Sequence, residues 1–458
     1  MTDLIIIGSG PGGYRAADYA ARAGLTVTIV EEGHLGGTCL NCGCIPTKAF
    51  CHDAELASAG LPLDFAAVCA HKQEVVEQLR GGIEGLMSAP GITLLRGRAC
   101  LDKEGDEVVV RVGDETLHAR HIIIATGSRP KMPPIPGIYL PGVVTSTELL
   151  DTDHIPQRLV IVGAGVIGME FAGVFSAMGS QVTMLEFMKE CLPTLDEDIA
   201  KRLRKSMEKR GITFQLGAAV KEITVGGPST DSQAENSLTV HYERKGKAET
   251  VEADTVLVAT GRAANVEGLG LEALGIATDR RGIVVDAETL EVKEFILRRA
   301  QEPGSSGQRL FAIGDVNGRQ MLAHAATFQG FRAVNTILGR QDGIRLDIMP
   351  AAVFTTPEAA GVGPTEEQLK AAGRAITVHR GHYKACGKAL AIRQTEGVVK
   401  LITDAHTDAI LACHILGAHA SDMVQEVTAL MNRDATLQQL RETIHIHPTL
   451  SEILQDLA

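Results

Sequence analysis

Short apolar runs that end at glycine recur along this chain. Leu4–Ile7 and Leu159–Val162 are each followed by a glycine-rich turn, a segment with apolar residues at helical spacing, and a second apolar run, Thr26–Val30 or Gln181–Leu185. An uninterrupted apolar run of this length is typical of a strand that is buried on both faces of a parallel sheet. Strand, turn, helix and strand in this order form a βαβ unit. The pattern therefore predicts an α/β fold that contains the unit twice.

The glycines of both turns have the spacing of a dinucleotide-binding turn. They are Gly8, Gly10 and Gly13 in the first copy, and Gly163, Gly165 and Gly168 in the second. In such a turn the first glycine allows the tight bend, the second lets the backbone approach a pyrophosphate, and the third allows the helix to pack closely on the strand. In both copies 23 positions separate the first glycine from an acidic residue, Glu31 or Glu186, which is suited to bind a ribose hydroxyl. Two dinucleotide sites are therefore predicted.

Later segments divide the chain further. Each βαβ unit is closed by an apolar strand that ends in Ala-Thr-Gly, with Thr126 and Gly127 in the first copy and Gly261 in the second, and a further strand leads into Gly314 and Asp315. From about residue 347 the pattern changes to β-rich segments and then to a helix over about 421–440. We predict four segments: a first dinucleotide-binding domain at 1–145, a second at 146–265, a return segment at 266–345, and a C-terminal α+β interface domain at 346–458. Polar stretches at 228–236 and 302–308 predict surface loops.

Composition and charge narrow the classes of function. No apolar run reaches the length of a membrane span and residues 1–7 carry no basic leader, so we expect a soluble, cytoplasmic protein without a membrane partner. The net charge of −12 disfavours nucleic acid as a partner, because nucleic-acid binding requires a basic surface. The basic run Lys201–Arg210 is interspersed with apolar residues and predicts a solvated helix face. Nine cysteines in 458 residues are too few for a disulfide scaffold, so any disulfide is expected to be catalytic.

The segment Gly36–Lys48 carries two thiols five residues apart, Cys39 and Cys44, shortly after the first βαβ unit. At a transition from loop to helix, this spacing can bring two Cα atoms within disulfide reach. A helix that Pro46 opens would favour the thiolate of Cys44 through its dipole. The segment therefore predicts a redox-active dithiol in contact with a flavin, with Lys48 as a cation beside the flavin ring.

A second interpretation takes four thiolates together, Cys39, Cys42, Cys44 and Cys51, around zinc or an iron-sulfur cluster. Structural zinc sites normally combine two separated pairs of ligands, whereas these four cysteines fall within 13 residues. We therefore predict no metal site. The role of Cys42 stays open between a passive small residue and a thiol that competes in disulfide exchange.

A histidine near the C-terminus is the second candidate for chemistry. His447 precedes Pro448, and a helix starting at Pro448 would carry Glu452 back towards the imidazole. A carboxylate that orients a histidine is the usual arrangement for activating a thiol or hydroxyl. We interpret His445, His414 and His419 as structural, because a histidine without such a partner more often is.

In this order, the motifs resemble the pyridine nucleotide disulfide oxidoreductase family, and within it most closely the dihydrolipoamide dehydrogenases. The resemblance covers nearly the whole chain, from the first glycine turn to the segment His447–Glu452. It implies FAD in the first dinucleotide site, NAD in the second, and a homodimer whose catalytic site is shared between two subunits.

The resemblance also implies a role for each matching residue. Cys39 exchanges with substrate, Cys44 lies against the flavin, and His447 with Glu452 is the acid/base that reaches the cysteine pair of the other subunit. Lys48 is expected to pair with Glu170. The implied FAD-binding residues are Gly8, Gly10, Gly13, Glu31, Gly37, Thr38, Lys48, Thr126, Gly127, Gly314 and Asp315. The implied NAD-binding residues are Gly163, Gly165, Gly168, Glu170, Glu186 and Gly261.

The implied activity is oxidation of protein-bound dihydrolipoyl groups to lipoyl groups, with reduction of NAD through a Cys39–Cys44 disulfide. The lipoyl carrier would be the acyltransferase of a 2-oxoacid dehydrogenase complex or the carrier protein of glycine cleavage. Glu186 is not followed by an arginine pair, and its carboxylate would repel the 2′-phosphate of NADP. Two alternatives are kept: an NAD(P)H-dependent reductase of another small disulfide or of Hg(II), and a non-enzymatic redox or metal-binding protein.

Overall fold

The computed structural model describes residues 2–228, 236–295 and 307–457. The loops predicted at 228–236 and 302–308 therefore lie mostly outside the described residues. By contacts the chain divides into two compact units. The first unit comprises Met1–Pro46, Ala70–Lys131 and Arg262–Leu346, and the second unit comprises Thr47–Cys69, Met132–Gly261 and Asp347–Ala458. Each unit is described by itself.

The first unit is built on a parallel sheet of five strands. The strand order is β18-β7-β1-β2-β3, and the bounds are β1 Thr2–Ile7, β2 Val27–Glu31, β3 Ile92–Arg96, β7 Ala119–Ile124 and β18 Arg309–Ala312. Leu4 to Ile6 are completely buried, as expected for a strand with neighbours on both sides and a layer on each face. The predicted strand before Gly314 is present as β18, which pairs in parallel with β7 although almost 190 residues separate them in sequence.

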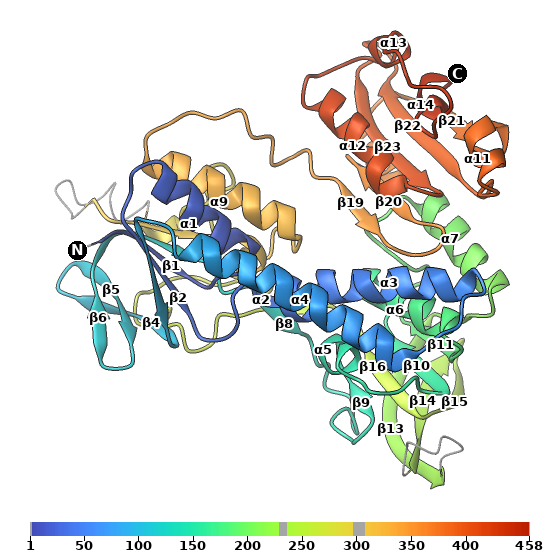
Figure 1. Cartoon of the computed structure of the whole chain (residues 1–458), viewed down its shortest axis with the longest axis horizontal. Coiled ribbons are helices and arrows are strands. Elements are labelled where there is room, and N and C mark those ends of the chain that lie inside the picture. The colour runs from blue at the N-terminus through green and yellow to red at the C-terminus, as the bar shows by residue number, and fades with distance from the viewer. Residues whose placement is uncertain (1, 229–235, 296–306, 458) are drawn as a thin grey trace. The chain divides into compact units, whose positions relative to one another are not determined.

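Two helices pack against each other in this unit, α1 Pro11–Arg22 and α9 Ala323–Ile337, and Figure 1 shows them side by side. A Cβ atom on Gly330 would lie 3.0 Å from the carbonyl oxygen of Gly12, so the two backbones approach closely. The unit also contains two smaller sheets, β4 Ala99–Glu104, β5 Glu107–Val112 and β6 Glu115–Leu117 in one, and β8 Ser128–Pro130 with β17 Arg262–Ala264 in the other.

The second unit contains the second βαβ motif. Its parallel sheet has the order β12-β11-β10-β16-β9, with β9 Val143–Val144, β10 Arg158–Val162, β11 Gln181–Glu186, β12 Thr213–Leu216 and β16 Thr255–Val258. The helices that accompany it are α5 Ser146–Leu150, α6 Val166–Ala177 and α7 Glu197–Lys209. An antiparallel sheet of β13 Ala218–Pro228, β14 Asn236–Arg244 and β15 Lys247–Ala253 lies between β12 and β16 in the chain.

The C-terminal part of the second unit is an antiparallel sheet with helices, as predicted. The strand order is β19-β20-β23-β22-β21, with β19 Ala351–Val353, β20 Ala359–Val362, β21 Ile376–His382, β22 Val398–Asp404 and β23 Ile410–Leu416. Its helices are α10 Glu366–Ala371, α11 Gly387–Ala391, α12 Ala420–Met431, α13 Leu437–Arg441 and α14 Glu452–Gln455, with the 3₁₀ turn η2 Tyr383–Ala385.

The prediction of one helix over 421–440 is wrong, because α12 and α13 are separate helices. Asp434 has a positive φ of 51°, which ends the α-helical backbone. Thr436 then opens α13 with a capping box that includes Gln439. The sequence signal for this break was the run Asn-Arg-Asp-Ala-Thr, which contains turn and cap formers between two apolar stretches.

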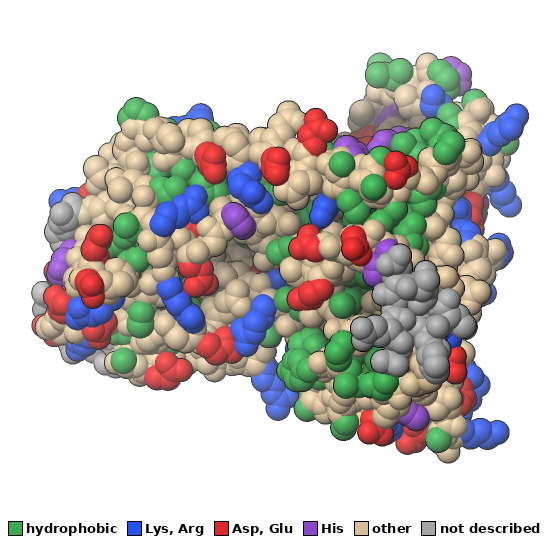
Figure 2. All heavy atoms as spheres, turned by 60° about the horizontal axis from the view of Figure 1, so that its bottom comes forward, with side chains coloured by type: hydrophobic (Ala, Val, Ile, Leu, Met, Phe, Trp, Pro, Cys, Tyr) green, Lys and Arg blue, Asp and Glu red, His purple; other side chains and the backbone are tan. Residues whose placement is uncertain are grey.

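Charged side chains are distributed without separation of sign. On the face shown in Figure 2, acidic and basic side chains are interspersed. In α7, Lys201 pairs with Glu197 and Arg202 with Asp198, each one helical turn apart, so the basic run forms local ion pairs. Within the described part of the chain, no helix is both long enough and apolar enough to cross a lipid bilayer.

Candidate active site

The first glycine turn forms a cradle at the N-terminus of α1. Gly8 has φ +99°, and a Cβ atom there would lie 2.4 Å from the carbonyl oxygen of Ala125. A Cβ atom on Gly13 would lie 1.9 Å from the carbonyl oxygen of Gly8. Gly10, in contrast, has no atom within 4 Å of a Cβ position, so its backbone faces open space. Gly8 and Gly13 are required by the fold itself, whereas Gly10 leaves room for a ligand at the positive end of the helix.

The acid at the end of β2 is directed towards this turn. Glu31 accepts hydrogen bonds from the backbone N–H of Ser9 at 2.7 Å, from the Ser9 hydroxyl at 2.6 Å, and from Gly33 N–H at 2.7 Å. The carboxylate therefore lies beside the glycine turn, where the ribose of a bound dinucleotide would lie.

The second glycine turn repeats this geometry in the second unit. A Cβ atom on Gly163 would lie 2.5 Å from Ala259 O, one on Gly168 would lie 2.1 Å from Gly163 O, and Gly165 again faces open space. Glu186, buried at the end of β11, accepts hydrogen bonds from Ala164 N–H at 2.6 Å and from Met188 N–H at 2.7 Å. The two turns therefore agree in their packing as well as in their sequence.

The redox segment is built from two helices, α2 Gly37–Cys42 and α3 Cys44–Ser58, with Gly43 between them. A Cβ atom on Gly43 would lie 2.9 Å from Thr38 O and 3.4 Å from Cys39 Cα, so the chain folds back against the first turn of α2. This contact brings the start of α3 close to Cys39. Cys44 is exposed, and Cys39 and Cys42 are half-buried.

The helix that carries Cys44 starts earlier than predicted. We expected Pro46 to open it, but α3 begins at Cys44 and Pro46 occupies the third position. Proline is tolerated there because the first N–H groups of a helix have no intrahelical acceptor. Cys44 therefore lies in the first turn, where the helix dipole favours a thiolate.

Lys48 and Glu170 form an ion pair within the second unit. Lys48 Nζ donates to the two carboxylate oxygens of Glu170 at 2.7 and 2.9 Å, and the Glu170 side chain is 5% exposed. Phe354 completes the arrangement, because its backbone N–H donates to Glu170 at 2.9 Å and its ring centroid lies 4.3 Å from Lys48 Nζ. Both oxygens of the buried Glu170 carboxylate therefore accept hydrogen bonds, and these contacts hold Lys48 in one orientation.

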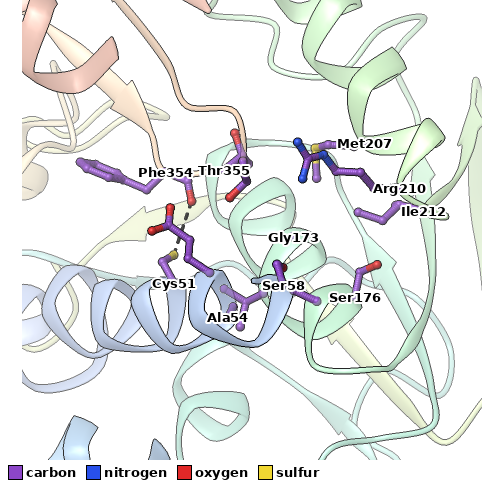
Figure 3. Close-up of a pocket in the computed structure, with 14 residues that line it drawn as sticks. Cys51, Ala54, Ser58, Gly173, Ser176, Met207, Arg210, Ile212, Phe354 and Thr355 are labelled. Atoms are coloured by element: carbon purple, nitrogen blue, oxygen red, sulfur yellow. Dashed lines mark hydrogen bonds between the residues drawn. The ribbon is translucent and has the colours of Figure 1, made fainter. Parts of the chain in front are cut away.

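A cavity of about 240 Å³ lies on the second unit beside α3 and α6. Figure 3 shows Cys51 in this cavity with its Sγ atom directed at the carbonyl oxygen of Phe354, to which it donates at 3.4 Å. Burial raises the pKa of Cys51 to about 12. The residue is therefore a protonated thiol at neutral pH, which argues against its participation in a four-thiolate metal site. The described residues contain no group of three or more His, Cys, Asp or Glu side chains placed to hold a metal ion.

Two of the other buried thiols, Cys191 and Cys413, are also unsuited to thiolate chemistry. Burial raises their pKa values far above the ordinary value. Both are packed in apolar clusters.

Asp315 was expected from the motifs, but its hydrogen-bond partners Ser128 and Arg262 were not. Ser128 Oγ donates to Asp315 Oδ2 at 2.5 Å, and Arg262 donates to Ser128 Oγ at 2.7 Å and to Ser128 O at 2.6 Å. Ser128 and Arg262 each follow an Ala-Thr-Gly closure, and the strands that they begin, β8 and β17, pair with each other. The duplicated closure was the available signal, and its meaning depended on this pairing. Thr126 is held in the same region, because its hydroxyl donates to Asn265 O at 2.8 Å.

His447 and Glu452 are in direct contact. The Nδ1 atom of His447 lies 2.8 Å from Glu452 Oε1, and the His447 side chain is 80% exposed. Thr449 N–H donates to the other carboxylate oxygen at 2.8 Å. The predicted helix from Pro448 is absent, since α14 begins at Glu452, and the contact is made across a turn. The hydrogen bond from Thr449 and that from His447 lower the pKa of Glu452, so the carboxylate stays ionised and orients the imidazole through Nδ1.

Comparison with known proteins decides the family. Residues 2–330 match the pyridine nucleotide-disulphide oxidoreductase family, and residues 349–458 match its dimerisation domain. The chain belongs to the pyridine nucleotide-disulphide oxidoreductase family. It is therefore a flavoprotein disulfide oxidoreductase with an α/β fold and a C-terminal dimerisation domain, and the family is FAD-dependent.

Relatives extend over the full length of the chain. Dihydrolipoyl dehydrogenase 3 of Pseudomonas putida is 38% identical over 475 residues, covering 100% of this chain and 97% of that protein. Dihydrolipoyl dehydrogenase of Bacillus subtilis is 36% identical over 481 residues with the same coverage. The HOCl-induced flavoprotein disulfide reductase RclA of Escherichia coli has been solved alone and as a Cu(II) complex. The structure of RclA alone superimposes on this chain with a TM-score of 0.85 at 32% identity, and the match covers 99% of each chain.

Proposed function

We propose that this enzyme oxidises protein-bound dihydrolipoyl groups to lipoyl groups and reduces NAD. The observation that carries the proposal is the exposed His447, oriented by Glu452, in a chain that also presents a dithiol segment at Cys39 and Cys44. An exposed base suits a substrate that arrives on a flexible arm of another protein. The full-length similarity to dihydrolipoyl dehydrogenases supports the same substrate.

Both glycine turns fit the cofactors of the family. Gly10 and Gly165 each leave open space at a helix N-terminus, and Glu31 and Glu186 each lie beside their turn. We propose FAD at the first turn, with Gly37, Thr38, Lys48, Thr126, Gly127, Gly314 and Asp315 as further contacts, and NAD at the second, with Glu170 and Gly261. Bound FAD would supply the two-electron redox chemistry that links the dithiol to nicotinamide.

The proposed chemistry of this chain's own residues is thiol–disulfide exchange. Nε2 of His447 from the partner subunit takes a proton from a dihydrolipoyl thiol, and the resulting thiolate attacks Cys39 Sγ of the Cys39–Cys44 disulfide. Cys44 leaves as a thiolate, which the first turn of α3 favours. The second substrate thiol then attacks the substrate sulfur of the mixed disulfide, and its proton passes to Cys39 Sγ, so that the lipoyl disulfide and the Cys39 thiol are released. The dithiol now holds the two electrons that the substrate lost.

We infer from Glu186 that the second site binds NAD in preference to NADP. Its carboxylate is buried and fixed by two backbone N–H groups, so it cannot turn away from a ribose phosphate. Two negative charges at about 4 Å repel each other by ~4 kcal/mol in a surface-like dielectric. We therefore propose a strong preference for NAD.

Turnover of dihydrolipoamide with NAD and with NADP tests the proposal. We expect NADH formation at a rate in the usual range for enzymes of roughly 1–1,000 per second, and a rate with NADP lower by at least tenfold. Cys44→Ser should abolish this rate, and the matched control Cys100→Ser, a thiol outside the redox segment, should keep it. A panel in which dihydrolipoamide gives no NADH while another disulfide is reduced by NADH would reject the lipoyl assignment.

A second candidate is reduction of another disulfide or of a metal ion such as Hg(II). Two observations favour it: the third thiol, Cys42, within the redox segment, and the similarity to the RclA reductase. Steady-state rates of NADH and NADPH oxidation with such oxidants, compared between the wild type and Cys42→Ser, separate this candidate from the first. A drop confined to these oxidants in the variant would support it.

A further inference from the structure

A second histidine–carboxylate pair lies two residues before His447. His445 Nε2 lies 2.6 Å from Glu426 Oε1, and His445 Nδ1 lies 2.8 Å from Thr443 O. The His445 side chain is 4% exposed, whereas its neighbours Ile444 and Ile446 are 93% and 79% exposed. Within an otherwise exposed segment, His445 is therefore the side chain that is turned inward, onto α12.

The segment between α13 and α14 depends on such side-chain bonds. Among the described residues, 444–449 take part in no main-chain to main-chain hydrogen bond. The downstream end is fixed by Glu452, which binds Thr449 N–H and His447, and by Thr449 Oγ1, which donates to Ile446 O at 2.7 Å. The upstream end is fixed by the pair of His445 with Glu426.

Both ring nitrogens of His445 have an oxygen partner. Nδ1 faces the carbonyl oxygen of Thr443, and Nε2 faces the carboxylate of Glu426. Two further ionisable groups interact with the pair. Burial and the charge of Glu426 raise the pKa of Cys413 on β23, and His445 adds to the hydrogen bonds from Thr449 and His447 that lower the pKa of Glu452. The ion pair is therefore connected to the catalytic pair by charge as well as by the chain.

We propose that His445 and Glu426 are positioning residues that fix the segment carrying His447 and orient its imidazole. The inference rests on the proposed function only for its kinetic consequences. The anchoring itself is a property of the C-terminal domain and is measured without turnover.

The test compares Glu426→Ala, Glu426→Gln and a control, Gln425→Ala, an exposed neighbour on α12. Glu426→Ala should increase hydrogen–deuterium exchange in peptides covering 443–449. It should also lower kcat for dihydrolipoamide by ~10- to 100-fold, because small displacements of a catalytic group are costly. The KM value and the rate of NADH-dependent ferricyanide reduction, which bypasses the thiols, should stay unchanged. Glu426→Gln keeps an acceptor but loses the charge, so we expect near-normal exchange with a displaced pH profile of kcat.

Two results would overturn the inference. One is wild-type exchange at 443–449 together with a wild-type pH profile in both variants. The other is a fall in the rate of ferricyanide reduction together with a lower midpoint of thermal unfolding, which would mean that the pair stabilises the fold and does not position His447. If the wild type does not oxidise dihydrolipoamide, the proposed function fails, while the exchange measurement still decides whether Glu426 anchors the segment.

Discussion

At the scale of single residues, glycines with the same motif have different physical roles. Packing allows no larger residue at Gly13, because a Cβ atom there would overlap the carbonyl oxygen of Gly8, whereas a Cβ atom at Gly10 would meet open space. The sequence pattern treats the two positions alike. The structure separates a glycine that the fold requires from one that leaves room for a ligand.

Paired substitutions test this separation. Gly13→Ala should destabilise the protein by ~1–3 kcal/mol or more, because the helix must move away from β1. Gly10→Ala should leave the free energy of unfolding of the apoprotein within about 0.5 kcal/mol of the wild type, yet lower the flavin content. Urea unfolding of the apoproteins and flavin absorbance per chain measure the two effects. Full flavin binding by Gly10→Ala would contradict the proposed approach of the pyrophosphate to this residue.

Thiol reactivity is a second test at the residue scale. With its pKa raised from 9.0 to about 12, Cys51 holds ~1,000-fold less thiolate at neutral pH than an ordinary thiol. After reduction, Cys44 should therefore react with iodoacetamide far faster than Cys51, Cys191 or Cys413. Mass spectrometry of the labelled peptides over time gives the order. Early labelling of Cys51 would show that the cavity beside α3 is more solvated than its geometry indicates.

At the scale of elements, a buried ion cluster joins β22 to α7 and α10. Lys400 Nζ donates to both carboxylate oxygens of Asp196 at 2.8 Å and pairs with Glu366 at 2.5 Å, and the Lys400 side chain is 1% exposed. Asp196 also caps α7, accepting from Asp198 N–H at 3.2 Å. The cluster therefore holds the second βαβ motif and the C-terminal sheet in one unit.

Removal of the lysine should be costly. Lys400→Met leaves the buried carboxylate of Asp196 without its cation, whereas Glu366 keeps Lys370 and Arg380 as partners. We expect a loss of ~3–5 kcal/mol in the free energy of unfolding. Asp196→Asn combined with Lys400→Met should restore part of this loss. Equilibrium unfolding in urea is the measurement, and exposed Lys384→Met is the control. Additive losses in the double variant would mean that the groups do not interact.

The same cluster predicts a pH dependence of stability. Hydrogen bonds from Lys370 and Lys400 lower the pKa of Glu366 from 4.5 to about 2. Burial acts to raise the pKa of Asp196, but the hydrogen bond and charge of Lys400, the nearby His414 and the backbone N–H of Glu366 together lower the value. Because both values are lower in the folded state, the stabilisation is complete above pH ~4.5 and is lost as the pH falls towards 2. Unfolding measured from pH 6 to 2 should show this loss, and Glu366→Gln should reduce the slope.

At the scale of the whole molecule, the dimerisation domain supports a homodimer, and we expect the exposed apolar side chains beside His447 to lie at its interface. Ile444 and Ile446 project beside His447. Burial of one such side chain contributes about 1.5–3 kcal/mol. Ile446→Glu should therefore increase the fraction of monomer in sedimentation experiments and lower dihydrolipoamide turnover in parallel. Tyr139→Ser, also at an exposed position, is the control. An unchanged dimer in Ile446→Glu would place the interface elsewhere.

The sequence alone determined the elements whose signals are local. Short segments with fixed spacing specify the two glycine turns, the buried strands that precede them, and the acids Glu31 and Glu186. These motifs and their order along the chain were sufficient to predict the family. The cysteine pair was predicted in the same way, because the signal for a redox-active dithiol is the spacing of two thiols along the chain. The break between α12 and α13 was missed because an apolar helical pattern continues on both sides of a turn.

The tertiary structure decided what depends on residues far apart in sequence. The network of Ser128, Asp315 and Arg262 exists because β8 pairs with β17, and no local pattern encodes that pairing. The inward turn of His445 likewise depends on Glu426, which lies 19 residues away on α12. Burial of charges and the shifts in pKa follow from packing, which brings distant segments together. Local sequence therefore specifies which elements form, and only the folded chain specifies which side chains meet.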